Sequence, residues 1–238
     1  MRAFTMPIAE PVDEVVLTFH AGTPAQRSIR LAKIVDHMKG HAPIARGANS
    51  RVWRFIPTKG GAPYQGETSF ALKCCHIEPA TGLRCPPHEY GYLSRLSSPL
   101  FPRAIGHGVM ANGDYVLVSE WIDGRNLARH ILEILTELLE RNTYEMFCSD
   151  LLEILRLLTA AGIEHSDIWE PNIIVRQGRP VLIDFGWAHA PGEPPLIPTL
   201  HQPDDTIAMN QLLKRLAALY NQLLLESEIE KLASDART

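Results

Sequence analysis

Two short apolar runs, residues 173–175 and 181–183, are joined by a Gln-Gly-Arg-Pro segment that contains turn-forming glycine and proline. This pattern predicts a β-hairpin. Polar residues flank the hairpin: Asp167 and Asn172 precede the first run, and Asp184 follows the second. A hairpin brings its two ends together, so we expect the three side chains to lie close enough to surround one reacting group.

Such a cluster suits phosphoryl transfer, because one carboxylate can take the proton of an acceptor hydroxyl while a carboxamide and a second carboxylate hold Mg²⁺. The spacing His165-x-Asp167-x4-Asn172, followed by D-F-G from Asp184, resembles the catalytic loop and D-F-G segment of the protein-kinase-like superfamily. The resemblance implies that Asp167 is the catalytic base and that Asn172 and Asp184 are Mg²⁺ ligands with catalytic roles. The alternative is that these residues only make turn hydrogen bonds and end a strand.

Residues 44–56 are predicted to form a hairpin around residues 47–50, where the family carries its glycine-rich phosphate loop. Of the three family glycines only the middle one is present, as Gly47, and this is the glycine that lets backbone N–H groups approach phosphate closely. The resemblance implies that Gly47, Ser50 and Val52 border the phosphates of ATP. An ordinary hairpin turn is the alternative.

Residues 68–75 are predicted to form a strand, and its F-A-L-K segment resembles the V-A-I-K motif of kinases. The resemblance places Ala71 against adenine and Lys73, a catalytic residue, on the phosphates of ATP. A lysine in an apolar strand is costly to bury without a partner, so we expect a carboxylate beside it. Glu89 in a predicted short helix is the expected partner, and Glu78 is the weaker choice. Glu89 could instead be a solvated carboxylate favoured by the helix dipole.

Strands are expected over residues 103–110 and 115–119, and the segment after them resembles the hinge between kinase lobes, where backbone groups of Glu120 and Ile122 would bind adenine. The resemblance implies an α+β fold, bilobal and protein-kinase-like, with a small β-rich N-lobe and a shortened helical C-lobe. The expected divisions are an N-terminal extension over residues 1–40, the N-lobe over residues 41–122 and a minimal C-lobe over residues 123–238.

Helices are expected over residues 23–38, 126–140 and 142–161, and a strand over residues 12–20. The third helix begins with the capping-box pair Asn142 and Glu145 and ends at Gly162.

A long helix is expected from residue 206 to residue 225 or beyond, after the adjacent aspartates Asp204 and Asp205. The resemblance implies that Asp205 anchors the backbone of the catalytic loop. Simple N-capping of the helix is the alternative, and one residue can do both.

The chain departs from the family at several positions. Ser166 replaces the arginine of H-R-D, Trp169 replaces a lysine of serine/threonine protein kinases, and no A-P-E follows D-F-G. In the family that arginine pairs with a phosphorylated activation segment. We therefore predict that activity does not depend on phosphorylation of Thr199, the single hydroxyl-bearing residue in the proline-rich stretch 187–204. The minimal C-lobe is similar to small atypical kinases, RIO-like, lipopolysaccharide-kinase-like or effector-kinase-like.

Composition limits the partners. The 238-residue chain has a formal net charge of −4, which gives no reason to expect nucleic acid or an anionic membrane. The sequence has no signal-peptide pattern and no apolar run of about 18 residues that would span a membrane. The four cysteines lack metal-ligand spacing, so we expect reduced thiols in a cytoplasmic protein. A secreted effector that acts inside another cell would look the same.

The resemblance implies a phosphotransferase that uses ATP and Mg²⁺ and transfers the γ-phosphoryl group to a protein hydroxyl, and we expect a monomer. Two alternatives remain open. One is a small-molecule kinase that acts on a sugar, a lipid or an aminoglycoside-type compound. The other is a pseudokinase that serves as a binding scaffold.

Overall fold

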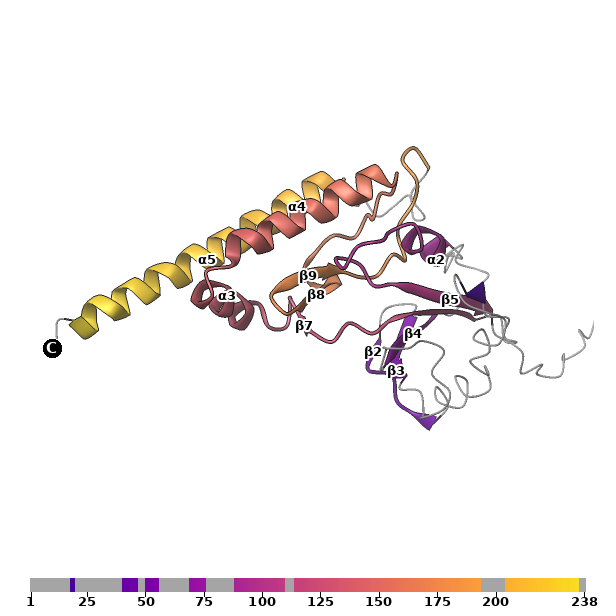
Figure 1. Ribbon diagram of the computed structural model, residues 1–238, viewed down its shortest axis with the longest axis horizontal. Helices are drawn as coiled ribbons and strands as arrows, with labels where there is room; N and C mark the ends of the chain where they lie inside the picture. Colours follow the sequence, from indigo (N-terminus) through magenta and orange to yellow (C-terminus); the bar gives the residue numbers. More distant parts are fainter. Residues whose placement is uncertain are drawn as a thin grey trace, which may run out of the picture. The chain divides into compact units, whose positions relative to one another are not determined.

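The structure is a computed structural model that describes residues 18–19, 40–46, 50–55, 69–75, 88–109, 114–193 and 204–235. The described residues form an α+β fold whose strand pairs are all antiparallel (Figure 1). The chain divides into two compact units. The first comprises residues 1–87 and 104–121, and the second comprises residues 88–103 and 122–238.

The first unit contains a six-stranded sheet in the order β1-β5-β6-β4-β3-β2. Its strands are β1 (Thr18–Phe19), β2 (Ala45–Arg46), β3 (Ser50–Phe55), β4 (Phe70–Cys75), β5 (Ala104–Val109) and β6 (Tyr115–Glu120). Three predictions are confirmed: the hairpin over residues 44–56, the strand that carries Lys73, and the strand pair over residues 103–110 and 115–119.

Side chains alternate across this sheet, and one face carries its core. Trp53 and Phe55 of β3 lie on that face with Phe70 and Leu72 of β4. Each is almost completely buried, which is worth about 2 kcal/mol per large apolar side chain. The period-two pattern of these strands therefore determines which side chains face the core.

The N-terminal predictions fall mostly on residues that the structure does not describe. The helix expected over residues 23–38 lies outside the described residues, as does Gly47 of the expected phosphate loop. Within the strand expected over residues 12–20, the two residues of β1 are described, and they pair with His107 and Gly106 of β5.

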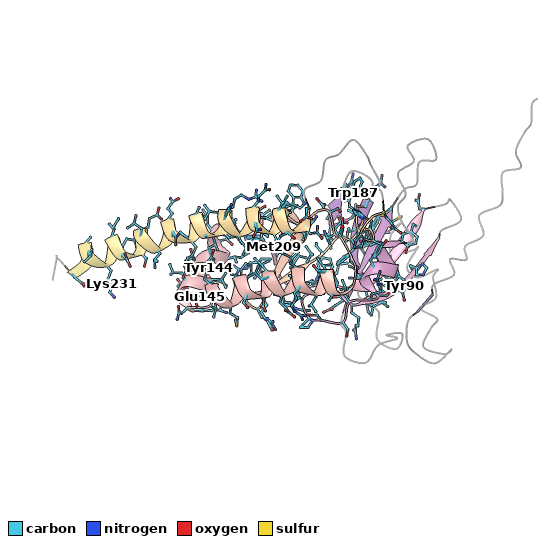
Figure 2. The ribbon with its side chains drawn as sticks, turned by 90° about the horizontal axis from the view of Figure 1, so that it is seen from above. Tyr90, Tyr144, Glu145, Trp187, Met209 and Lys231 are labelled. Carbon is cyan, nitrogen blue, oxygen red and sulfur yellow. The ribbon has the colours of Figure 1, made fainter. Side chains whose placement is uncertain are left out.

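The second unit carries the helices α2 (His88–Leu93), α3 (Ile131–Glu140), α4 (Tyr144–Ala160) and α5 (Asp205–Asp235). Helices α4 and α5 run side by side (Figure 2). Tyr144 of α4 stacks on Tyr220 of α5 with ring centroids 3.8 Å apart. The helices share a core of buried apolar side chains: Ile134, Leu135, Leu138, Phe147, Leu151, Ile154, Leu158, Met209, Leu212 and Leu216.

Helix α3 begins at Ile131 rather than at residue 126, because the chain before it forms strand β7 (Arg125–Asn126). Strand β7 pairs with β8 through Arg125 and Val175. The approach is close: a Cβ atom on Gly124 would lie 2.5 Å from the backbone oxygen of Val175. Tertiary pairing thus overrides the helical pattern of these two residues.

Helix α4 ends as expected but begins differently. Gly162 follows its end with a φ of 61°, a left-handed conformation that suits glycine. The capping box of Asn142 and Glu145 is wrong. Thr143 is the N-cap and makes no side-chain cap, while Asn142 has a φ of 52° and lies before it. Asn142 is instead part of the tight turn between α3 and α4, for which a left-handed residue is needed.

A second, three-stranded sheet has the order β7-β8-β9, with β8 spanning Ile173–Arg176 and β9 spanning Arg179–Leu182. Strands β8 and β9 are the hairpin expected from the two apolar runs. Its turn is shorter than the expected Gln-Gly-Arg-Pro segment, because Gln177 and Gly178 alone connect the strands. Both have positive φ, 53° and 78°, as the favoured two-residue hairpin turn requires.

The expectation of four reduced cysteines is wrong for Cys75, which is disulfide-bonded. Adjacency along the chain does not reveal which sulfurs meet in the fold. Cys74 and Cys148 are free, and burial, followed by the nearby Asp114 carboxylate, raises the pKa of Cys74 to about 12. In the part of the chain that the structure describes, no helix has the length and apolarity needed to cross a membrane.

Candidate active site

The two ends of the β8–β9 hairpin meet beside Asn172, the last residue of a short 3-10 helix, η1 (Glu170–Asn172). Nδ2 of Asn172 donates to the carboxylate oxygen Oδ2 of Asp167 at 2.7 Å and to its backbone oxygen at 2.9 Å. The backbone N–H of Ile183 donates to the backbone oxygen of Asn172 at 2.9 Å. Asp167 and Asn172 are therefore in direct contact, and Asp184 follows the residue bonded to Asn172.

Asp184 is held in a left-handed conformation with a φ of 67°. Its Oδ1 accepts a hydrogen bond from the backbone N–H of Gly186 at 3.2 Å, a local contact that helps an aspartate adopt this conformation. The next side chain, Phe185, is only 1% exposed and packs edge-on against His165 and Phe101, with ring centroids 4.7 and 6.0 Å away. The buried phenylalanine fixes the backbone that presents Asp184.

The side chains of Asn172 and Asp184 fit Mg²⁺ as ligands. Nδ2 of Asn172 donates both of its hydrogen bonds to Asp167. The side-chain oxygen Oδ1 of Asn172 is therefore the atom that would bind Mg²⁺. Carboxylate and amide oxygens suit Mg²⁺, which usually keeps several waters and binds substrate phosphates. Among the described residues no three His, Cys, Asp or Glu side chains form a metal cluster. The pair Asn172 and Asp184 is not such a cluster, because it has two members and asparagine is not one of these four residue types.

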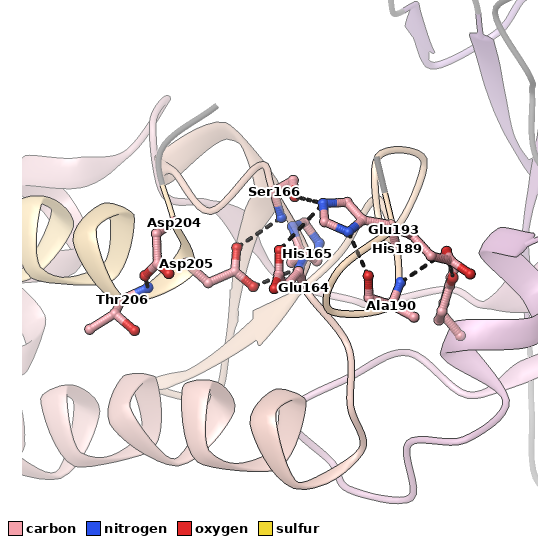
Figure 3. A network of polar contacts seen from close by, with 10 residues as sticks. Glu164, His165, Ser166, His189, Ala190, Glu193, Asp204, Asp205 and Thr206 are labelled. Carbon is pink, nitrogen blue, oxygen red and sulfur yellow. Dashed lines mark hydrogen bonds and ion pairs between the residues drawn. The ribbon is translucent and has the colours of Figure 1, made fainter. Parts of the chain in front are cut away.

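Asp205 anchors the backbone of the loop before Asp167, as predicted. Its carboxylate accepts hydrogen bonds from the backbone N–H groups of His165 at 2.6 Å and Ser166 at 2.8 Å (Figure 3). Burial raises the pKa of Asp205, and the two N–H donors oppose that rise. Capping of α5 belongs to the neighbouring Asp204, whose Oδ1 accepts from the N–H of Thr206 at 2.7 Å. The two adjacent aspartates thus have separate tasks.

We expect Asp205→Ala to lower the free energy of unfolding by about 3 kcal/mol, because two buried N–H groups lose a charged acceptor. Asp204→Ala is the matched control and should cost about 1 kcal/mol, the usual effect of losing an N-cap. Urea unfolding of both variants measures the difference. Equal losses would contradict the separation of the two roles.

Glu89 is buried in α2 of the second unit, with 3% of its surface exposed. Its Oε1 accepts a hydrogen bond from the backbone N–H of Phe185 at 3.2 Å. The sequence does not indicate this contact, because the two residues lie 96 positions apart. Lys73 belongs to the first unit, and its pairing with Glu89 stays a prediction. Ile122, also in the second unit, is buried.

The other expected nucleotide contacts lie in the sheet of the first unit. Val52 of β3 is directly opposite Lys73 of β4, and Ala71 is opposite Ser119 of β6. Because side chains two residues apart share a face of a strand, Ser50, Val52, Ala71 and Lys73 lie on one face, opposite the core around Trp53. Glu120 ends β6. The sheet therefore gathers four of the residues that the resemblance assigns to ATP.

The pairing of Lys73 with Glu89 can be tested by a double-mutant cycle. Lys73→Met is expected to lower activity severely and Glu89→Gln to a lesser degree. Glutamine keeps an oxygen that can accept from the N–H of Phe185, so this variant removes the charge alone. If the two side chains form one charge pair, the loss in the double variant is far smaller than the product of the single losses. Independent effects would show that Glu89 is the wrong partner.

Two polar residues beside the loop that carries Asp167 were not singled out from the sequence. Nε2 of His189 lies 2.9 Å from Oγ of Ser166. Glu170 of η1 is buried and accepts a hydrogen bond from Arg215 of α5 at 2.8 Å. Their partners are 23 and 45 positions away, and no local pattern marks either residue.

The chain is similar to the probable serine/threonine-protein kinase YbdM of Bacillus subtilis (strain 168), with 35% identity over 103 residues. The match covers 42% of this chain and 38% of that protein, so the chain spans well under half the length of this relative. No family model matches the chain.

Proposed function

We propose that this chain has a bilobal protein-kinase-like fold and is an ATP- and Mg²⁺-dependent phosphotransferase that acts on a protein hydroxyl. The observation that carries the proposal is the arrangement at the hairpin ends. There Asn172 bonds the carboxylate of Asp167, and Asp184 adjoins the backbone bonded to Asn172. Similarity to a protein named as a probable serine/threonine kinase supports the same activity.

In this reaction the Asp167 carboxylate takes the proton of the acceptor hydroxyl. The hydroxyl oxygen forms a bond to the γ-phosphorus of ATP, the bond from that phosphorus to the β–γ bridging oxygen breaks, and ADP leaves. The hydrogen bonds from Asn172 orient Asp167 for this task. Asn172 and Asp184 would hold Mg²⁺, which neutralises charge on the phosphates.

The remaining assignments concern nucleotide binding. Lys73 would neutralise phosphate charge and Ala71 would contact adenine, with Ser50, Val52 and Gly47 along the phosphates. Backbone groups of Glu120 and Ile122 would bind the adenine edge. The shared face of β3 and β4 supports the placing of Ser50, Val52, Ala71 and Lys73 in one site.

Thermal unfolding with Mg·ATP, with ATP plus EDTA, and without nucleotide tests the binding of the substrate. A ligand that binds only the folded state at about 100 times its Kd adds about 2.7 kcal/mol, so Mg·ATP should raise the melting temperature by several degrees. No rise with Mg·ATP would contradict the proposed function.

The acceptor class is tested by incubation with γ-labelled ATP and a cell lysate, resolved into protein and small-molecule fractions. We expect label in the protein fraction. Label confined to the small-molecule fraction would indicate a small-molecule kinase. A rise in melting temperature without label in either fraction would indicate a scaffold.

A further inference from the structure

Ser166 occupies a conformation that needs support. Its φ is 63°, in the left-handed region that serine rarely adopts, and its side chain is buried directly before Asp167. Asp205 holds the backbone N–H groups of His165 and Ser166 from one side (Figure 3). A strained backbone of this kind persists only where its surroundings fix it from several directions, so the contacts of the Ser166 side chain matter for Asp167.

The hydroxyl of Ser166 meets His189, which is 8% exposed. The backbones of His189 and Glu164 exchange two hydrogen bonds of 2.9 Å, which fixes the histidine against the catalytic loop. Its Nδ1 lies 3.0 Å from the backbone oxygen of Ala190, which is an acceptor only, so Nδ1 carries a proton. Nε2 lies 2.9 Å from Oγ of Ser166, and in the neutral imidazole it accepts a hydrogen bond from that hydroxyl. The carboxylate of Glu164 is farther from Nε2, at 3.5 Å.

The residues that follow His189 in the chain, Ala190 and Glu193, are also held in place. Oε2 of Glu193 accepts hydrogen bonds from the backbone N–H of Ala190 at 3.2 Å and from the hydroxyl of Tyr92 in α2 at 3.3 Å. The N–H of Glu193 donates to the backbone oxygen of Ala190 at 3.0 Å. These contacts run from α2 through the segment after D-F-G to the residue before Asp167.

We propose that His189 is a positioning residue of the phosphotransfer site: through its hydrogen bond with the hydroxyl of Ser166 it holds the backbone that presents Asp167. The inference rests on the proposed function. It also supplies a physical reason for the prediction that Thr199, which lies outside the described residues, need not be phosphorylated. Where the family uses an arginine that pairs with a phosphate, this chain has a serine–histidine hydrogen bond between the same two segments.

The test measures label transfer from γ-labelled ATP to the acceptor fraction of the lysate for Ser166→Ala, His189→Ala and the double variant. Each single variant is expected to lower kcat about tenfold, the effect of one lost hydrogen bond in the transition state, with KM for Mg·ATP unchanged. The double variant is expected to be no slower than the slower single variant, because both remove the same bond. His189→Gln, which keeps an acceptor and a donor, should recover most of the loss.

His130→Ala is the matched control, because His130 is an exposed histidine bonded to Glu133 at the start of α3. It should behave as wild type. Single variants with wild-type kcat, or independent losses in the double variant, would overturn the proposal while leaving the proposed function intact. Wild-type protein that transfers no label would overturn both. If His189→Ala does not fold, Ser166→Ala and His189→Gln still decide the question, since the first removes a single hydroxyl and the second preserves the bond.

Discussion

Asp167→Ala is expected to lower the rate of phosphoryl transfer by about 10²- to 10⁴-fold, the range usual for loss of a general base. The affinity for Mg·ATP should be nearly unchanged, because Asp167 orients the acceptor and takes its proton. Its observed partner is the amide of Asn172, at 2.7 Å. Label transfer gives the rate, and isothermal titration with Mg·ATP gives the affinity.

The control for this variant is Glu145→Ala, which removes an exposed carboxylate at the start of α4 (Figure 2). It should match wild type in both measurements. Collapse of nucleotide affinity in Asp167→Ala would show that Asp167 has been given the wrong role. An unchanged transfer rate would remove it from the chemistry altogether.

Asp184→Asn should abolish turnover, because the Mg²⁺ that it would hold neutralises charge across the β- and γ-phosphates. The substitution is conservative in this fold. Asparagine tolerates the left-handed conformation of residue 184, and its side-chain oxygen can still accept from the N–H of Gly186. What it removes is the negative charge.

Nucleotide binding separates this role from general damage to the site. We expect Asp184→Asn to bind ATP more weakly than wild type when Mg²⁺ is present and equally well in EDTA. Titration of both proteins in the two buffers makes the comparison. Full activity, or equal weakening in both buffers, would contradict the assignment of Asp184 as a metal ligand.

The elements around the candidate site follow local sequence patterns, which explains why they could be predicted. The β8–β9 hairpin depends on two apolar runs and a glycine turn, and the face that carries Lys73 depends on alternation along β4. The expectation that Asp205 anchors the backbone of this loop came from the resemblance, and its two hydrogen bonds to His165 and Ser166 confirm that contact.

What the sequence did not reveal depends on residues that meet only in the folded chain. The contact of Glu89 with the N–H of Phe185 joins positions 96 residues apart, and His189 reaches Ser166 across 23 residues. The capping box at Asn142 failed for the opposite reason. A local pattern was present, but the tight turn between α3 and α4 requires a left-handed residue at that position.

The most direct measurement is the initial rate of label transfer from γ-labelled ATP to lysate components, with and without Mg²⁺, for wild type, Asp167→Ala and Asp184→Asn. We expect wild type to transfer label only when Mg²⁺ is present. The rate for Asp167→Ala should be lower than that of wild type by a factor of about 10² or more, and Asp184→Asn should transfer none. Absence of transfer by wild type, or equal transfer by all three proteins, would contradict the assignment of this chain as a phosphotransferase.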